Sequence, residues 1–291
     1  MTTGTQGPRL NTAGLSRDIE ILELLGGAES TRSDGLGVIR IAQLTGRDKA
    51  VISRTLATLT DAGLAVRDEM SQNYRLGSRI FALAARTVES VLVRLARDHL
   101  RRVSQATRET SHLCVLRGGN VLTLLSELSP YEFRTTGWEG ITTAAWRTPS
   151  GRVLVSDWDT ESLGQWYTDH GQDAAVVGPV SPALTASALT VLDRPPASNA
   201  VVTDFDSLLM EVERIRERGY ATLDEELERG VVGASAPVVD FNDRIIAAIN
   251  VSAPKSRISG QLDALGSFVA RASRDLSISL GSPAASGSTS G

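Results

Sequence analysis

The chain of 291 residues contains a single cysteine, Cys114, so it has no internal disulfide and no zinc site built on several cysteines. It also lacks any run of about 18 apolar residues, the length that a membrane-spanning helix needs. Its N-terminus shows neither a basic segment followed by an apolar one nor a lipidation signal. These absences predict a cytoplasmic protein with a reduced thiol and no membrane partner.

Patterns typical of catalysis are also scarce. His112 and Cys114 lie two residues apart on a predicted strand, so both face one side, as a nucleophile and its base would. No orienting acid stands at a recognisable spacing, and a buried thiol beside a histidine is the favoured interpretation. The acidic run "DEELER" at 224–229 has no matching histidine cluster, and "RGGN" at 117–120 is a hairpin turn. We predict no enzymatic activity, no metal and no cofactor.

The formal net charge of -4 argues against a protein that coats nucleic acid without specificity. Residues 1–77 carry nine Lys or Arg and nine Asp or Glu, so this segment is not basic as a whole. Any affinity for DNA would therefore depend on where its basic side chains gather, and on a dimer that offers two half-sites.

Residues 15–77 are predicted to form a winged helix-turn-helix domain behind a flexible arm at 1–14. The segments 15–26 and 36–46 both follow the i, i+3, i+4 rhythm of an amphipathic helix, and a third helix follows Gly46 closely. The predicted core face of the first helix is Leu15, Ile19, Leu22 and Leu25. That of the third is Ile52, Leu56 and Leu59. Two short helices joined by a tight turn are the helix-turn-helix arrangement, and 64–77 alternates as two short strands, the wing.

The outer face of the third helix has small side chains between arginines, which suits a DNA major groove. Small residues permit close approach, and arginine can form paired hydrogen bonds with guanine. The residues predicted to face the groove are Arg47, Ala50, Ser53, Arg54 and Ala57. The side chains predicted to hold backbone phosphates are Lys49, Arg67 and Arg75.

The rest of the chain is predicted to form a second domain. Residues 78–106 have helical periodicity without proline or glycine, which predicts a linker helix that also makes dimer contacts. Residues 107–279 contain hairpins, at 113–127 and 235–254, interleaved with helices, which indicates an α+β domain with an antiparallel sheet. The small, polar residues at 280–291 predict a disordered tail.

Several segments resemble the IclR family of bacterial transcriptional regulators. These are "IAQLTGRDKAVISRTLATLTDAGLAVRD" followed by "YRLG", then "GWEG" and "TPSGRVLVS", and finally "RERGYATLDEELERGVVGASAPVVDFNDRIIAAINVSAP". The resemblance implies an N-terminal winged helix-turn-helix, a linker helix and a C-terminal effector domain with a GAF-like or profilin-like sheet. It also implies homodimers or dimers of dimers that bind operator DNA and a small carboxylic or aromatic effector.

The resemblance also places an effector pocket in the second domain. Carried over to this sequence, its lining would be Thr148, Pro149, Ser150, Leu223, Asp224, Val231, Gly233, Asn250 and Ser252, with Trp138 and Trp146 beside them. Many members have cysteine at the position of Gly233 and histidine at that of Trp146. This difference predicts a pocket that is roomier on one side and more aromatic on the other, suited to an aromatic or bulky effector.

The sequence thus predicts a ligand-responsive repressor of a catabolic operon. An alternative is a sensor module in which the winged domain serves protein assembly without specific DNA binding. Phosphate contacts release counterions, so a steep dependence of affinity on salt would favour the regulator.

Overall fold

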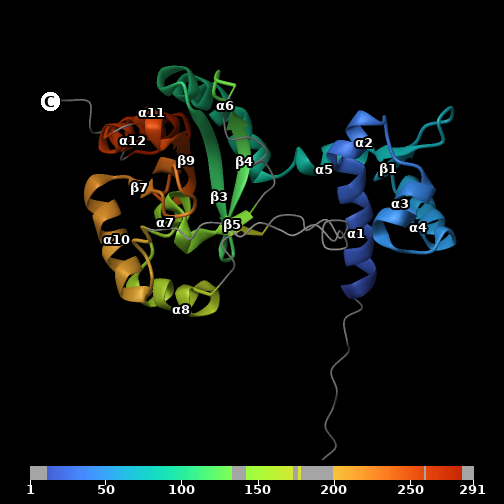
Figure 1. Ribbon diagram of the computed structural model, residues 1–291, viewed down its shortest axis with the longest axis horizontal. Helices are drawn as coiled ribbons and strands as arrows, with labels where there is room; N and C mark the ends of the chain where they lie inside the picture. The colour runs from blue at the N-terminus through green and yellow to red at the C-terminus, as the bar shows by residue number, and fades with distance from the viewer. Residues whose placement is uncertain (1–11, 133–141, 173–175, 178–198, 259, 284–291) are drawn as a thin grey trace, which may run out of the picture. The chain divides into compact units, whose positions relative to one another are not determined.

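The computed structural model describes residues 12–132, 142–172, 176–177, 199–258 and 260–283. Contacts between residues divide the chain into two units, one extending to Ser90 and the other beginning at Val91. Figure 1 shows both units. No helix in these ranges combines the length and the apolar character needed to cross a membrane.

The first unit contains the predicted helix-turn-helix and wing. Its helices are α1 (Thr12–Gly26), α2 (Ala28–Arg32), α3 (Val38–Thr45) and α4 (Lys49–Asp61). The wing strands β1 (Ala65–Arg67) and β2 (Tyr74–Leu76) pair antiparallel. Residues 27–35, between the first two predicted helices, contain the short helix α2.

The turn between α3 and α4 is set by two residues. Gly46 ends α3 in the left-handed region at φ 66°, where a side chain would be strained. Asp48 then caps α4, because its Oδ1 accepts a hydrogen bond from the Ala50 backbone N–H at 2.7 Å. The face predicted to be buried, Ile52, Leu56 and Leu59, does lie in the core of this unit.

The apolar face of α1 differs from the prediction. Ile21 and Leu25 are buried in the core, whereas the side chains of Leu15 and Ile19 are 67% and 45% exposed. The helix is longer than the small domain against which it packs, so its first turns extend past the core. The i, i+3, i+4 rhythm correctly indicated a helix but included two residues that this unit does not cover.

The predicted linker helix at 78–106 consists of two helices, α5 (Ser78–Ala84) and α6 (Val88–Thr107). Local hydroxyl groups explain the break. Thr87 Oγ1 donates to the Ala84 carbonyl at 2.9 Å and accepts from the Ser90 backbone N–H at 3.3 Å. Such side-chain bonds end one helix and cap the next.

Helix α6 is part of the sheet domain and not a free connector. Leu92, Ala96, Leu100 and Val103 on one of its faces are buried in the larger hydrophobic core of the second unit. The sheet domain therefore begins near Val91, earlier than the predicted boundary at 107.

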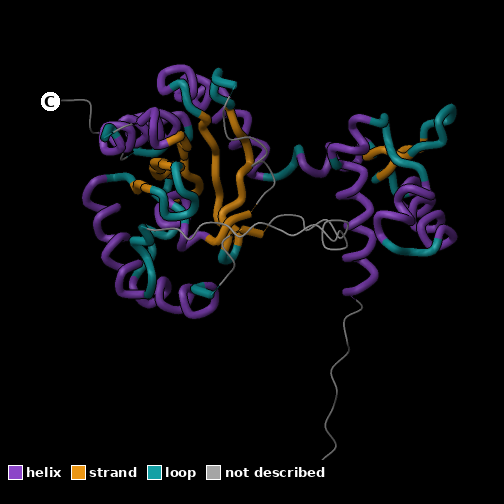
Figure 2. Tube along the Cα trace, in the orientation of Figure 1, coloured by secondary structure: helices purple, strands orange, loops and turns teal. Residues whose placement is uncertain are grey.

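A seven-stranded antiparallel sheet forms the centre of the second unit, with strand order β6-β5-β4-β3-β9-β8-β7. Strands are orange in Figure 2. The strands are β3 (Thr110–Arg117), β4 (Asn120–Glu127), β5 (Thr142–Ala144), β6 (Val176–Val177), β7 (Ala221–Asp224), β8 (Val231–Val239) and β9 (Ile245–Pro254). The two predicted hairpins are β3–β4 and β8–β9. The chain is thus α+β, as predicted.

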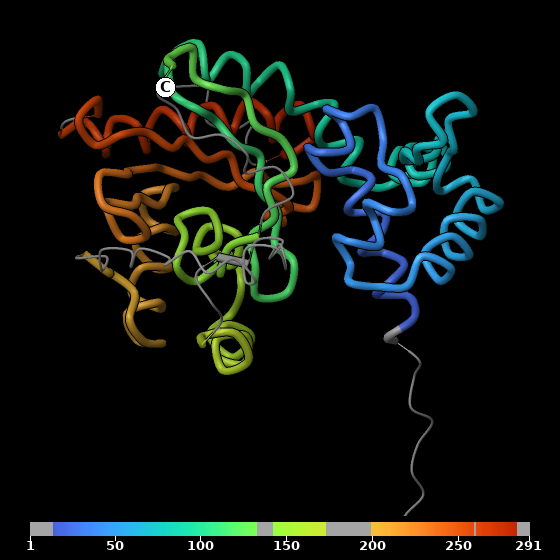
Figure 3. Tube along the Cα trace, turned by 45° about the vertical axis from the view of Figure 1, so that its right-hand side comes forward, coloured from blue at the N-terminus to red at the C-terminus, as the bar shows by residue number. Residues whose placement is uncertain are grey.

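Helices cover both faces of this sheet (Figures 1 and 3). On one side pack α6 and α12 (Leu262–Ser279), preceded by the short α11 (Lys255–Ile258). On the other lie the 3-10 turn at Ala145–Arg147 and helices α7 (Pro149–Leu154), α8 (Thr160–His170) and α10 (Phe205–Arg218). Successive β3 residues alternate between the two sides: Leu113 and Val115 join the α6 and α12 core, and Cys114 joins the other.

Candidate DNA-contacting face and ligand cavity

The outer face of α4 is open to solvent, opposite its buried apolar face. Ala50, Ser53, Arg54 and Ala57 are all exposed, as is Lys49 at the start of the helix. Within the described part of the chain, neither Lys49 nor Arg54 takes part in an ion pair. The small residues and one extended cation on this face match the shape that the sequence predicted for groove entry.

Arg47 does not lie on that free face. Its guanidinium forms an ion pair with Glu20 of α1 and also donates to the Arg17 carbonyl at 2.9 Å. Its side chain is only 19% exposed. The prediction placed Arg47 on the outer face of the helix, but α4 begins at Lys49, so Arg47 belongs to the turn and points toward α1. In the structure its contacts link α1 to the turn.

The two wing arginines have different surroundings. Arg67 is exposed and lies over the Tyr74 ring, 5.5 Å from its centroid. Arg75 pairs with Asp34 at 2.9 Å and with Asp68 at 3.4 Å, so its charge is already compensated inside the domain. Of the two, Arg67 is the residue available for a phosphate.

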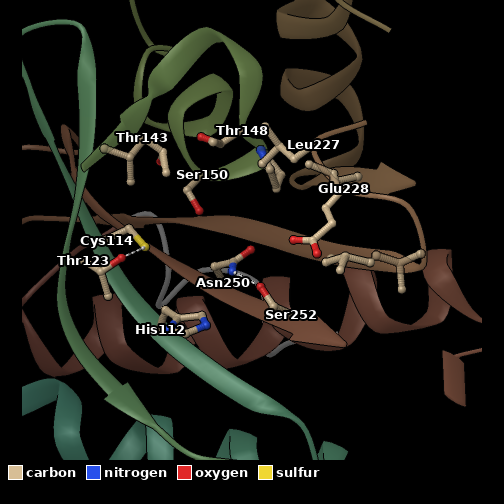
Figure 4. A pocket seen from close by; sticks show the side chains of 16 residues that line it. His112, Cys114, Thr123, Thr143, Thr148, Ser150, Leu227, Glu228, Asn250 and Ser252 are labelled. Atoms are coloured by element: carbon tan, nitrogen blue, oxygen red, sulfur yellow. Dashed lines mark hydrogen bonds between the residues drawn. The ribbon is translucent and has the colours of Figure 1, made fainter. Parts of the chain in front are cut away.

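A cavity of about 110 Å³ lies between the sheet and the start of α7 in the second unit (Figure 4). A cavity of roughly 10–15 Å³ holds one ordered water, so this larger cavity suits a small organic molecule. The lining residues are His112, Cys114, Val121, Thr123, Thr143, Thr148, Pro149, Ser150, Leu223, Leu227, Glu228, Val231, Val232, Gly233, Asn250 and Ser252. They come from β3, β4, β5, α7, β7, β8, β9 and the loop between β7 and β8.

The structure brings together at this cavity most of the residues that the resemblance assigned to a pocket: Thr148, Pro149, Ser150, Leu223, Val231, Gly233, Asn250 and Ser252. Asp224 is not among the lining residues, since its carboxylate pairs with Lys255 at 2.7 Å. Trp138 lies outside the described residues.

Among the described residues, Trp146 does not form the predicted aromatic wall of the cavity, because it belongs to the hydrophobic core on that side of the sheet. Its ring packs edge-on against Tyr167, with centroids 6.0 Å apart, and the Arg147 guanidinium lies 4.4 Å from its centroid. Gly233 borders the cavity, but a Cβ there would meet the Val251 carbonyl oxygen at 2.9 Å. Glycine at this position permits close packing of β8 on β9 and does not enlarge the pocket. Neither Gly233 nor Trp146 therefore favours an aromatic or bulky effector.

Residues of β3 and β4 complete the cavity, and sequence reasoning did not assign them to it. His112 and Cys114 point to the same side, and the hairpin register places Cys114 opposite Thr123. The alternation of β3 and the turn at Gly118 could have indicated these three positions. Leu227 and Glu228 had no such signal, because they lie in an irregular loop.

Burial keeps both groups on β3 uncharged near neutral pH. It lowers the pKa of His112 to about 4, and the ring Nδ1 lies 2.9 Å from Ser126 Oγ. Burial raises the pKa of the Cys114 thiol to about 11, partly offset by contacts with the Ser150 and Thr123 hydroxyls. A nucleophilic cysteine needs a thiolate, so these groups form a neutral, polar wall.

A buried ion pair holds the loop that borders the cavity between β7 and β8. Arg152 of α7 is 1% exposed and bonds to both carboxylate oxygens of Glu226, at 2.7 and 3.3 Å. It also donates to the Trp146 carbonyl at 3.0 Å, and Glu226 accepts from the Val201 backbone N–H at 3.2 Å. Leu227 and Glu228, the next residues, line the cavity.

A winged helix-turn-helix with an exposed recognition helix, followed by a sheet domain with a small polar cavity, defines a transcriptional regulator of two domains. The family model "IclR helix-turn-helix domain" matches residues 14–69, and "Bacterial transcriptional regulator IclR C-terminal" matches residues 179–278. The chain belongs to the IclR family of bacterial transcriptional regulators.

Relatives and solved structures agree with this assignment. The regulator BhcR of Paracoccus denitrificans is 29% identical over 268 residues, covering 91% of this chain and 86% of that protein. KdgR of Escherichia coli is 25% identical over 248 residues, covering 84% and 86%. The structure of Thermotoga maritima IclR superposes with a TM-score of 0.66 at 19% identity, covering 93% of this chain and 100% of that one.

A second solved structure contains a ligand. It is an IclR homolog from Microbacterium hydrocarbonoxydans complexed with 4-hydroxybenzoate, with a TM-score of 0.68 at 19% identity. The alignment covers 91% of this chain and 98% of that one. At this identity the likeness concerns the fold alone.

The buried pair generates a prediction about stability. Replacing Arg152 by methionine leaves Glu226 buried without its partner, and we expect the free energy of unfolding to fall by about 3–5 kcal/mol. Replacing both residues by methionine should recover much of that loss, because no charge is then left buried. Urea denaturation followed by circular dichroism measures both. As a control, Arg40→Met breaks an exposed pair with Glu29 and should cost far less, because solvent screens that pair; equal losses at the two sites would contradict this account.

The lowered pKa of His112 generates a prediction about pH. Its pKa is about 4 in the folded chain and 6.5, the ordinary value, in the unfolded chain, so the unfolded chain binds a proton at higher pH. The stabilisation is therefore complete above pH 6.5 and is lost as the pH falls toward 4, by on the order of 2–3 kcal/mol. Urea titrations at several pH values should show this slope for the native protein. His112→Gln should lose that part of it, and an identical slope in the variant would show that His112 is not the group responsible.

Proposed function

We propose that this protein is a repressor that binds operator DNA through α4 and responds to a small metabolite held in the cavity of its sheet domain. The observation that carries the proposal is the exposed outer face of α4 in a chain of a regulator family. This face has small residues and cations that form no ion pair with any described residue. The cavity supplies a place for the effector. The location we expect is the cytoplasm.

For DNA reading we propose Ser53 and Arg54 as the contacts to base edges. Ala50 and Ala57 permit close approach of the helix. Lys49 at the start of α4 and Arg67 on the wing would hold phosphates on either side. Because phosphate contacts release counterions, affinity should fall steeply with salt.

We propose a homodimer, or a dimer of such dimers, as the active form. The first unit exposes large apolar side chains on two helices: Leu15 and Ile19 on α1, at 67% and 45%, and Phe81 and Leu83 on α5, at 79% and 51%. A second copy of the chain that covers these residues would remove them from water. It would also present a second α4 for the other half of a two-fold operator.

The effector would act by shifting the equilibrium between arrangements of the dimer that fit and do not fit the operator. A ligand can do this only by binding one arrangement better than the other. The genes controlled would encode the breakdown of the effector or its precursor. The regulatory names of the relatives and the ligand complex of the Microbacterium hydrocarbonoxydans protein support this proposal.

Arg54→Ala tests the reading face. We expect specific binding to the DNA upstream of the gene to weaken by about 1–3 kcal/mol, roughly 5-fold to 150-fold, with folding intact, because one base-edge contact is removed. Fluorescence anisotropy at several salt concentrations measures the affinity. Arg117 is an exposed arginine on the β3–β4 turn, and the control variant Arg117→Ala should bind DNA like the native protein.

An Arg54→Ala variant with native affinity would show that Arg54 does not contact the bases. Absence of any specific binding by the native chain would favour a sensor that assembles without DNA.

Phe81→Ser tests the proposed dimer. Phe81 is 79% exposed within the chain, so its loss should leave the fold unchanged while weakening self-association at least 10-fold. Sedimentation velocity over a range of concentrations measures this. Met70→Ser removes an apolar side chain that is 94% exposed on the wing and should leave the association constant unchanged. A Phe81→Ser protein that dimerises like the native one would place the interface elsewhere.

A further inference from the structure

Glu228 is the one charged side chain among the described residues that line the cavity, and no lysine or arginine lines it. The residue is exposed at the mouth of the cavity, on the loop between β7 and β8. Figure 4 shows its carboxylate turned into the space above Asn250 and Ser252. An anionic ligand would therefore enter beside a fixed negative charge.

Two cations beside this loop are already engaged by acidic partners, and Arg229, which follows Glu228, is exposed and does not line the cavity. Lys255 pairs with Asp224 at 2.7 Å and with Glu225 at 2.8 Å. Arg152 is buried in its pair with Glu226. Neither is available to neutralise a ligand carboxylate, and burial keeps His112 neutral by lowering its pKa.

Asn250 supplies an unused hydrogen-bonding atom at the same place. The residue is only 9% exposed, and its Nδ2 donates to Ser252 Oγ at 2.9 Å. Its Oδ1 is buried and has no partner among the described residues. In Figure 4 this oxygen points toward the space that the Glu228 carboxylate faces. Turning the amide over would exchange the two atoms, but Glu228 would remain the only charge in that space.

Asn250 and Glu228 thus present hydrogen-bond acceptors at the place where the polar group of a ligand would lie. Two acceptor groups, Asn250 Oδ1 and the Glu228 carboxylate, call for a group with two N–H donors. The Thr148 hydroxyl is engaged by the Gly151 N–H and the Ala145 carbonyl. The Ser150 hydroxyl can donate or accept, so it tolerates the carbonyl of the same group. Apolar side chains, among them Val121, Leu223 and Val231, line the remainder.

Resting on the function proposed above, we propose that the effector is a small uncharged primary amide whose NH₂ group binds Asn250 and Glu228, and that the cavity discriminates against the matching carboxylate. Replacing the amide by a carboxylate would remove both donors and add a second negative charge beside Glu228. This effector class differs from the carboxylic one that the sequence resemblance implied.

The test compares amides with carboxylates of the same skeleton. Isothermal titration calorimetry on the full chain, without DNA, would use benzamide against benzoate and propionamide against propionate. We expect at least one amide to bind at least 10-fold more tightly than its carboxylate. Asn250→Ala should weaken that amide at least 10-fold.

Glu228→Gln separates charge from shape. Because the residue is exposed, the variant should fold, and thermal unfolding checks that it does. We expect it to strengthen carboxylate binding at least 5-fold and to change amide binding less than 3-fold. Glu213→Gln removes the same charge from an exposed position on α10 and should change neither.

Two results would overturn the assignment. One is a carboxylate that binds as tightly as its amide or more tightly. The other is the absence of amide binding up to 10 mM for both skeletons. Neither result bears on operator binding, which is measured separately with Arg54→Ala, so failure of the ligand class and failure of the proposed regulator are distinguishable.

Discussion

A sheet covered on both faces must present two different surfaces from one set of strands, and this constraint organises the second unit. Side chains alternate along a strand, so β3 sends Leu113 and Val115 into the core with α6 and α12. The intervening His112 and Cys114 face α7 and border the cavity. The cavity therefore requires no special element. It is the part of the second face that α7 and the β7–β8 loop leave unfilled.

Much of the fold could be predicted from local patterns. The face of Ile52, Leu56 and Leu59 on α4 and the two hairpins at the centre of the sheet are each determined by residues close in sequence. The pocket residues carried over from the family at Thr148–Ser150 and at Asn250 and Ser252 also lie at one cavity. Periodicity and turn chemistry suffice for such features because they act over a few residues.

Other features depend on partners distant in the chain. Arg47 and Arg75 were expected to contact DNA, but Glu20, Asp34 and Asp68 compensate them, and no spacing rule reveals such pairs. Trp146 packs against Tyr167 because α8 returns to that side of the sheet. The break between α5 and α6 rests on two hydroxyl groups that compete for backbone hydrogen bonds, and helical periodicity does not reveal this competition.

Because Arg152 holds Glu226, adjacent residues of the β7–β8 loop have different roles. Glu226 anchors the loop to α7 from within the core, and Leu227 and Glu228 present their side chains to the cavity. Changes at the latter two positions alter what the cavity meets without disturbing the anchor. A gene duplicate could therefore acquire a new effector through one or two substitutions at the cavity mouth while its fold, and the domain that carries α4, stayed the same.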